Sequence, residues 1–67
     1  PEAARDRLRR FVADHPRSPR AGAAHLALGK MLQGQDAAAA RAHLEAALAD
    51  EDARVREAAA RALAAPP

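Results

Sequence analysis

Apolar positions along the chain recur at the three- and four-residue spacing of α-helices, in four separate segments. The first segment predicts a helix from about Glu2 to Asp14. It should end near His15, because Pro16 disfavours helical geometry in the residue before it. The inward stripe of this helix comprises Ala4, Leu8, Phe11 and Val12.

The second segment predicts a helix that continues to about Gln33. Ser18 is a preferred N-cap residue and Pro19 suits the first helical position. Gly29 inside the helix costs roughly 1 kcal/mol relative to alanine, which indicates that another helix passes close by. Gly34 fits a C-terminal cap. The predicted inward positions are Ala24, Ala27, Leu28, Met31 and Leu32.

Acidic residues mark the starts of the two remaining helices. Asp36 is a natural N-cap for a helix over about residues 37–49, and the acidic run 50–52 caps a helix over about residues 53–65. The inward positions of the third helix are Ala40, Leu44, Ala47 and Leu48. Those of the fourth are Val55, Ala59, Ala62 and Leu63.

Composition supports helices throughout, because alanine dominates and the chain has few β-branched residues and one aromatic. Short connections place successive helices antiparallel. We therefore expect an all-α fold, a short α-solenoid of about four antiparallel helices. Residues 1–67 should form a single helical-repeat segment, with a repeat core over about residues 5–63, excerpted from a longer chain. Large apolar residues are scarce, so neighbouring repeats or a partner should help to bury the core.

An internal similarity appears when the chain is shifted by 36 residues. Arg5 then falls on Arg41, Leu8 on Leu44 and Asp14 on Asp50, at equivalent points of a helix–turn–helix. A period of this length is typical of stacked helical repeats.

The segment 22–32 resembles the first helix of a tetratricopeptide repeat (TPR), with its Leu-Gly pair at Leu28-Gly29. The run 34–36, Gly-Gln-Asp, is similar to the TPR turn between helices. The lead-in 11–21 resembles the inter-repeat turn of bacterial TPR proteins, including envelope proteins. This resemblance covers about residues 5–50 and implies a bacterial protein, in the cytoplasm or periplasm. His25 and Asp52 depart from the pattern, standing where TPRs carry an aromatic residue and a proline.

The resemblance also implies a function, the binding of another protein. In TPR proteins the first helix of each pair lines a concave groove that holds an extended or helical peptide. The positions carried over to this chain are Ala23, Leu26, Lys30, Gln33 and Arg61. We expect apolar contact around Leu26, and hydrogen bonds from Lys30 and Gln33 to a peptide backbone or carboxylate.

A rival resemblance concerns the last third of the chain. Residues 50–63 are similar to a HEAT repeat, with an acidic turn, Val55-Arg56 and an alanine-rich helix. A HEAT-like chain would be a structural spacer within a longer solenoid, whose partners are neighbouring repeats of the same chain.

Charge suggests a further alternative. The net charge is +2, but arginines crowd the first third of the chain, so the first helix resembles a basic amphipathic helix for an anionic surface. Asp6 and Asp14 interrupt the basic run. The single aromatic, Phe11, belongs to the predicted inward stripe, so no aromatic is available to stack on bases. We therefore favour a solvated arginine-rich face and expect no nucleic-acid partner.

Residues for catalysis or metal binding are few. The chain has no cysteine, and His15, His25 and His43 form no i, i+4 pair of the kind found in helical zinc sites. Ser18 is the sole serine and its predicted capping role accounts for it. The three glycines do not form a phosphate-binding loop. We expect no enzyme activity, cofactor, metal or membrane span.

Overall fold

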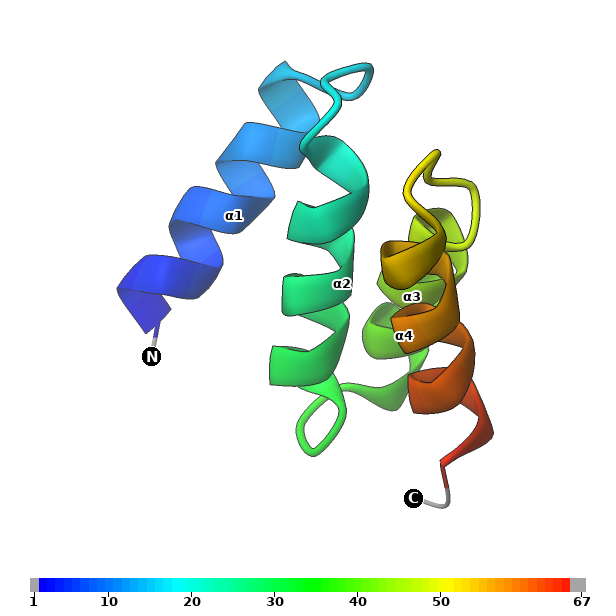
Figure 1. Ribbon diagram of the computed structural model, residues 1–67. Helices are drawn as coiled ribbons and strands as arrows, with labels where there is room; N and C mark the ends of the chain where they lie inside the picture. Colours follow the sequence, from blue (N-terminus) through cyan, green and yellow to red (C-terminus); the bar gives the residue numbers. More distant parts are fainter. Residues whose placement is uncertain (1, 66–67) are drawn as a thin grey trace.

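Four α-helices joined by short turns make up the part of the chain that the computed structural model describes, residues 2–65. They are α1 (Glu2–Asp14), α2 (Ala21–Leu32), α3 (Ala37–Ala47) and α4 (Ala53–Ala64). Successive helices run in alternating directions, and α1 diverges from α2 toward its N-terminal end (Figure 1). Residues 2–65 contain no strand, and the chain measures 31 × 27 × 15 Å. The predicted all-α class is confirmed.

Helix α2 lies at the centre of the packing. Its backbone approaches α1, α3 and α4, whereas the backbone of α1 approaches no other helix than α2. The two largest fully buried side chains are Leu28 of α2 and Leu44 of α3. The remaining buried apolar residues are Ala21, Ala24, Leu32, Ala40, Ala47 and Ala59. Alanine therefore supplies most of the core, and small side chains let the helices approach closely.

Gly29 is the point of closest approach between α2 and α3. A Cβ atom placed on Gly29 would lie 2.6 Å from Leu44 Cγ and 3.1 Å from the carbonyl oxygen of Ala40. Neither distance leaves room for a methyl group. The close approach expected from a glycine inside this helix is confirmed.

Two of the predicted helix caps form as expected. The Asp36 side chain accepts a hydrogen bond from the amide of Ala39 at the start of α3, and the Asp52 side chain accepts one from the amide of Arg54 at the start of α4. Each satisfies an amide that has no partner within its own helix. The two acidic starts predicted from the sequence are therefore confirmed.

The predicted cap at Ser18 is wrong. Helix α2 begins at Ala21, and its N-cap residue is Arg20, which makes no side-chain cap bond. Ser18 instead belongs to the preceding turn, where its Oγ accepts from the amide of Arg20 and its carbonyl accepts from the amide of Ala21. A serine hydroxyl can stabilise a turn in this way as readily as a helix start, and local sequence does not separate the two.

The glycine cap predicted at Gly34 is also wrong in its geometry. A glycine cap places this residue in the left-handed region, yet no glycine in residues 2–65 has a positive φ. The turn closes instead through the amides of Gln35 and Asp36, which both donate to the carbonyl of Leu32. These bonds satisfy the last carbonyl of α2, that of Leu32, without a left-handed residue.

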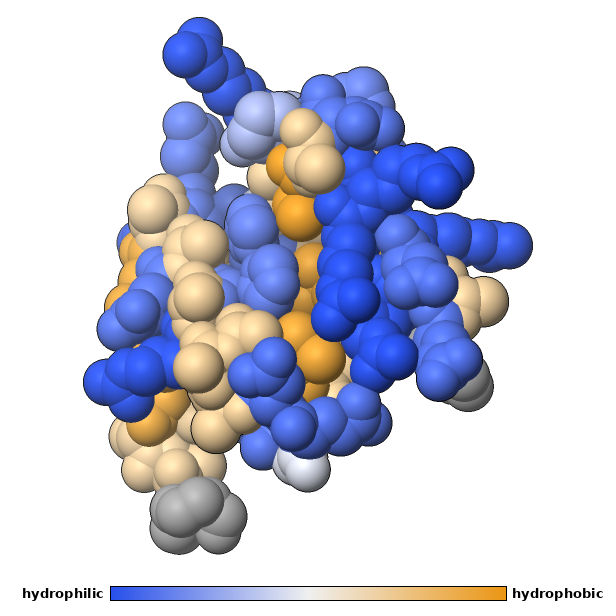
Figure 2. Space-filling model, turned by 180° about the vertical axis from the view of Figure 1, so that it is seen from behind, coloured by the Kyte–Doolittle hydropathy of each residue, from blue (hydrophilic) through white to orange (hydrophobic). Residues whose placement is uncertain are grey.

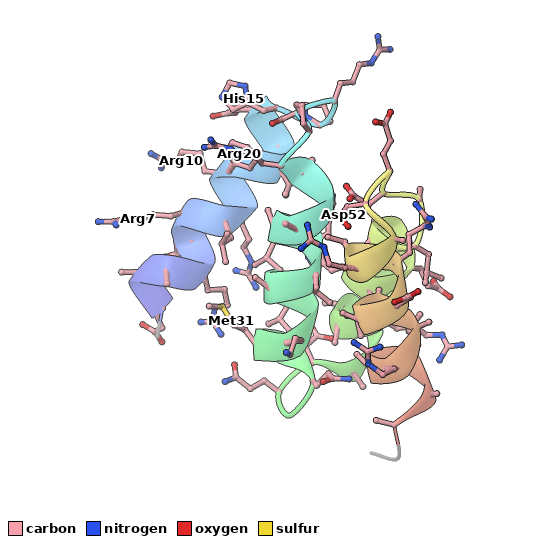
Figure 3. The ribbon with its side chains drawn as sticks, in the orientation of Figure 1. Arg7, Arg10, His15, Arg20, Met31 and Asp52 are labelled. Carbon is pink, nitrogen blue, oxygen red and sulfur yellow. The ribbon has the colours of Figure 1, made fainter. Side chains whose placement is uncertain are left out.

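Some residues predicted to face inward do not. Met31 is 39% exposed and lies in the gap where α1 diverges from α2 (Figure 3). Leu48 is 40% exposed because α3 ends at Ala47, so Leu48 is the C-cap residue rather than part of the last helical turn. Ala4 is exposed, and Leu8, Phe11 and Val12 are half-buried, since α1 has a single helical neighbour.

The core is covered unevenly. Figure 2 shows a band of apolar side chains that reaches the surface on the reverse face, bordered by strongly hydrophilic side chains.

At the open end of α1, Arg5 Nη1 donates a 2.7 Å hydrogen bond to Gln35 Oε1 in the turn between α2 and α3. This polar contact holds the diverging end of α1 to the rest of the molecule.

Candidate functional site

The predicted partner-binding positions of α2 lie away from the side that packs on α3. Ala23, Lys30 and Gln33 are exposed and Leu26 is half-buried. Their spacing of three, four and three residues places them on one face of the helix. This face is neither the Gly29 side, which meets α3, nor the Met31 side, which meets the gap toward α1.

One hydrogen bond joins this face to α4. Gln33 Nε2 donates to the carbonyl oxygen of Ala62 at 3.0 Å. Arg61, the predicted position on α4, precedes Ala62 in the chain and is exposed. The structure thus brings the C-terminal end of the α2 face beside the C-terminal half of α4. It gives no contact that places Ala23 or Lys30 beside Arg61.

The predicted face is cationic. Lys30 and Arg61 form no ion pair with any carboxylate in residues 2–65, whereas other cations of the chain do, such as Arg41 with Glu45 at 3.5 Å. Both side chains are exposed and free to meet an anionic group. Leu26, on the same face of α2 as Lys30, is half-buried and adds apolar surface to it.

A cleft of about 580 Å³ opens at the C-terminal end of this region. It is lined by Gln33, Gly34, Ala37, Ala40, Arg41, Leu44, Ala62, Leu63 and Ala65. Gln33 is the one predicted position that lines it. The cleft therefore extends the candidate surface toward α3, in a direction that the sequence did not indicate.

A histidine pair is the feature that sequence reasoning missed. His25 of α2 and His43 of α3 are half-buried and face each other, with Nδ1 atoms 2.9 Å apart and ring centroids 5.2 Å apart. A hydrogen bond at this distance requires one ring to carry its proton on Nδ1 and the other to accept there. The pair joins the two helices that form the centre of the core.

Burial keeps this pair neutral. Desolvation lowers the pKa of His25 below the 6.5 of an unperturbed histidine, and His43 lowers it further. Desolvation also lowers the pKa of His43, and the positive charge of Arg9 on α1 adds to the effect. Near neutral pH both rings are therefore uncharged.

A signal for the pair was present in the sequence. His25 and His43 each lie nine residues from Gly34, so an antiparallel hairpin centred on this turn brings them level. The i, i+4 spacing within one helix does not reveal a pair of this kind, because its two members lie on different helices. It becomes visible only when residues are matched across the turn.

The basic alternative on α1 has a different geometry. Arg7 and Arg10 project away from the molecule into solvent (Figure 3), while the half-buried stripe of Leu8, Phe11 and Val12 lies against α2. An interfacial helix buries its apolar face in lipid. In this chain the apolar face of α1 packs against α2 instead. None of the helices in residues 2–65 has the length and hydropathy needed to cross a bilayer.

No protein-family model, curated protein or solved structure matches this chain. The function of this chain must therefore be inferred from its own residues and their arrangement.

Proposed function

We propose that this chain is a protein-interaction module, a TPR-like piece of an α-solenoid that holds a peptide or helix of another protein against the α2–α4 face. Such repeats stack so that each helix pair packs on its neighbours, and the first helices of successive pairs stand side by side. In this proposal α2 and α3 form one pair, α4 begins the next and α1 ends the previous one.

The observation that carries the proposal is the contact of α2 with both α3 and α4, closed by the bond from Gln33 to Ala62. This contact supports the side-by-side placement of two first helices that a concave binding face requires. The free cations Lys30 and Arg61 favour a partner with carboxylates, and Leu26 provides apolar contact. Charge complementarity of this type raises association rates and selects partners.

The test is a charge reversal at Lys30. The Lys30→Glu variant should lose most of the partner binding seen for the parent chain in affinity capture, because an acidic group would repel the carboxylates of the partner. Lys30 is exposed and makes no ion pair in residues 2–65, so the helicity measured by circular dichroism should not change.

Arg7→Glu is the matched control. Arg7 is also exposed, and it projects from the outer face of α1, away from the proposed site (Figure 3). Its reversal makes the same change in net charge and should leave capture intact. Equal loss in both variants would indicate a general charge effect. Unchanged capture by Lys30→Glu would favour the HEAT-like spacer, in which the α2 face binds no partner.

A further inference from the structure

The hydrogen bond between the two histidines determines where the pair can take up a proton. The Nδ1 atoms of His25 and His43 are 2.9 Å apart, so one ring carries a hydrogen on Nδ1 and the other accepts there. In the neutral donor ring, Nε2 is free to bind a proton. In the neutral acceptor ring, Nε2 already carries the hydrogen and the lone pair of Nδ1 is occupied by the bond. The bond therefore leaves one protonation site open and blocks the other.

The first and second protons have different effects on this contact. A first proton on Nε2 of the donor ring leaves an imidazolium that still donates through Nδ1, and a charged donor makes the stronger hydrogen bond. A second proton requires Nδ1 of the acceptor ring. Both Nδ1 atoms would then carry hydrogens that point at each other, and two positive rings would lie with centroids 5.2 Å apart. The closed pair can hold one added proton but not two.

The charge of α1 favours His25 as the ring that takes the first proton. Burial resists a charge on either ring, and the positive charge of Arg9 on α1 additionally opposes one on His43. No such cation acts on His25, whose pKa is lowered by burial and by His43. In the singly protonated pair, His25 is therefore the imidazolium and His43 the acceptor.

The charges on the other side of His25 are balanced. This ring lines a cleft of about 580 Å³ together with Arg17 and the acidic run 50–52. Arg54 of α4 forms an ion pair within this run at 3.2 Å, and Arg56 of α4 donates to two of its backbone carbonyls at 2.8 and 2.7 Å. Three arginines thus accompany the three carboxylates, and Arg9 remains the charge that distinguishes the two rings.

From this geometry we infer that the His25–His43 pair is a pH-dependent switch in the α2–α3 hairpin, which stays closed with one added proton and opens when a second one binds. Opening separates the two helices that carry the largest fully buried side chains, Leu28 and Leu44. The switch lies in the central hairpin and does not depend on the partner-binding face proposed above.

Nuclear magnetic resonance of the ¹⁵N-labelled parent chain tests the bond directly. A scalar coupling between the Nδ1 atoms of His25 and His43, transmitted through the hydrogen bond, should be present at neutral pH. It should persist while Nε2 of His25 takes up the first proton and disappear with the second. His15, in the exposed turn after α1, should show no such coupling at any pH. Absence of the coupling at neutral pH, or its loss with the first proton, would overturn the inference.

Hydrogen exchange at the amides of Leu28 and Leu44 measures the opening itself. Between the two steps the closed pair holds one added proton and the open pair holds two. Protection, corrected for the intrinsic exchange rate, should therefore fall about tenfold per pH unit. A fall of about a hundredfold per unit would show that the first proton already opens the hairpin, and constant protection would show that the pair does not control it. Either result contradicts the switch.

Two sets of variants complete the test. In His25→Gln/His43→Gln the amide side chains can still hydrogen-bond but cannot take up a proton, so the tenfold slope should disappear. Arg9→Gln should move the first step to higher pH and spread it over both rings, because the charge that opposes a proton on His43 is gone. Arg7→Gln is the matched control and should titrate as the parent does, since Arg7 projects into solvent from α1 (Figure 3). A slope retained in the double variant, or equal shifts for the two arginine variants, would refute the assignment.

Discussion

At the scale of single residues, size decides more than polarity in this molecule. Gly29 allows α2 and α3 to touch, and the buried alanines keep the helix axes close. Gly34 has no such role, since a Cβ atom placed there meets nothing within 4 Å and its φ is not positive. Substitution by alanine should therefore change the free energy of unfolding in opposite directions at the two glycines.

Gly29→Ala should lower the free energy of unfolding by up to about 2 kcal/mol, even though alanine is the better helix former. Overpacking against Leu44 and the Ala40 carbonyl costs typically 1–3 kcal/mol, and the gain in helix propensity offsets at most about 1 kcal/mol of it. Gly34→Ala should raise the free energy of unfolding by about 0.4–1 kcal/mol, because it restricts the unfolded chain. Urea denaturation followed by circular dichroism measures both changes. A stabilising Gly29→Ala would contradict the close approach.

At the scale of elements, the central unit is the hairpin of α2 and α3, which the histidine pair joins side by side. The sequence predicted both helices, and it predicted the aspartate that starts α3. It did not predict the pair, because the contact depends on how the two helices align across the turn. The same dependence explains Leu48, whose exposure follows from the early end of α3.

The histidine pair makes the stability of this hairpin depend on pH. The folded-state pKa values of His25 and His43 lie below the 6.5 of an unperturbed histidine, so below about this pH the unfolded chain binds more protons than the folded one. The free energy of unfolding should therefore fall as the pH drops through 6.5, and the contribution of the pair should level off below the folded-state pKa values.

Thermal unfolding at a series of pH values measures this dependence. The double variant His25→Gln/His43→Gln should show a shallower decline between neutral pH and pH 5. His15→Gln serves as control and should retain the decline of the parent. A parent chain as stable below the folded-state pKa values as at neutral pH would contradict the buried neutral pair.

At the scale of the whole molecule, the small hydrophobic core limits the stability of the fold. A chain of this size has roughly 3–10 kcal/mol of stability. Among residues 2–65 the largest fully buried side chains are Leu28 and Leu44, and α1 contributes no buried residue. The loss of one central leucine therefore removes a large share of the total.

Leu44→Ala should destabilise the fold by about 2–5 kcal/mol, since it leaves a cavity between α2 and α3. Leu48→Ala is the matched control, four residues further along the chain. Because Leu48 is 40% exposed, this substitution should lower the free energy of unfolding by less than about 1 kcal/mol. Chemical denaturation of the two variants beside the parent gives the comparison. Similar losses in both would show that burial at these two positions is not as described.

The sequence by itself determined the four helices, their two aspartate caps and the glycine at a close approach. Each depends on residues within about one helical turn or on the size of one side chain. Only the tertiary structure decided that Met31 and Leu48 are exposed, that Gln33 reaches Ala62 and that His25 meets His43. These exposures and contacts depend on the angle and alignment between helices. Many weak interactions across the whole core determine that angle and alignment together.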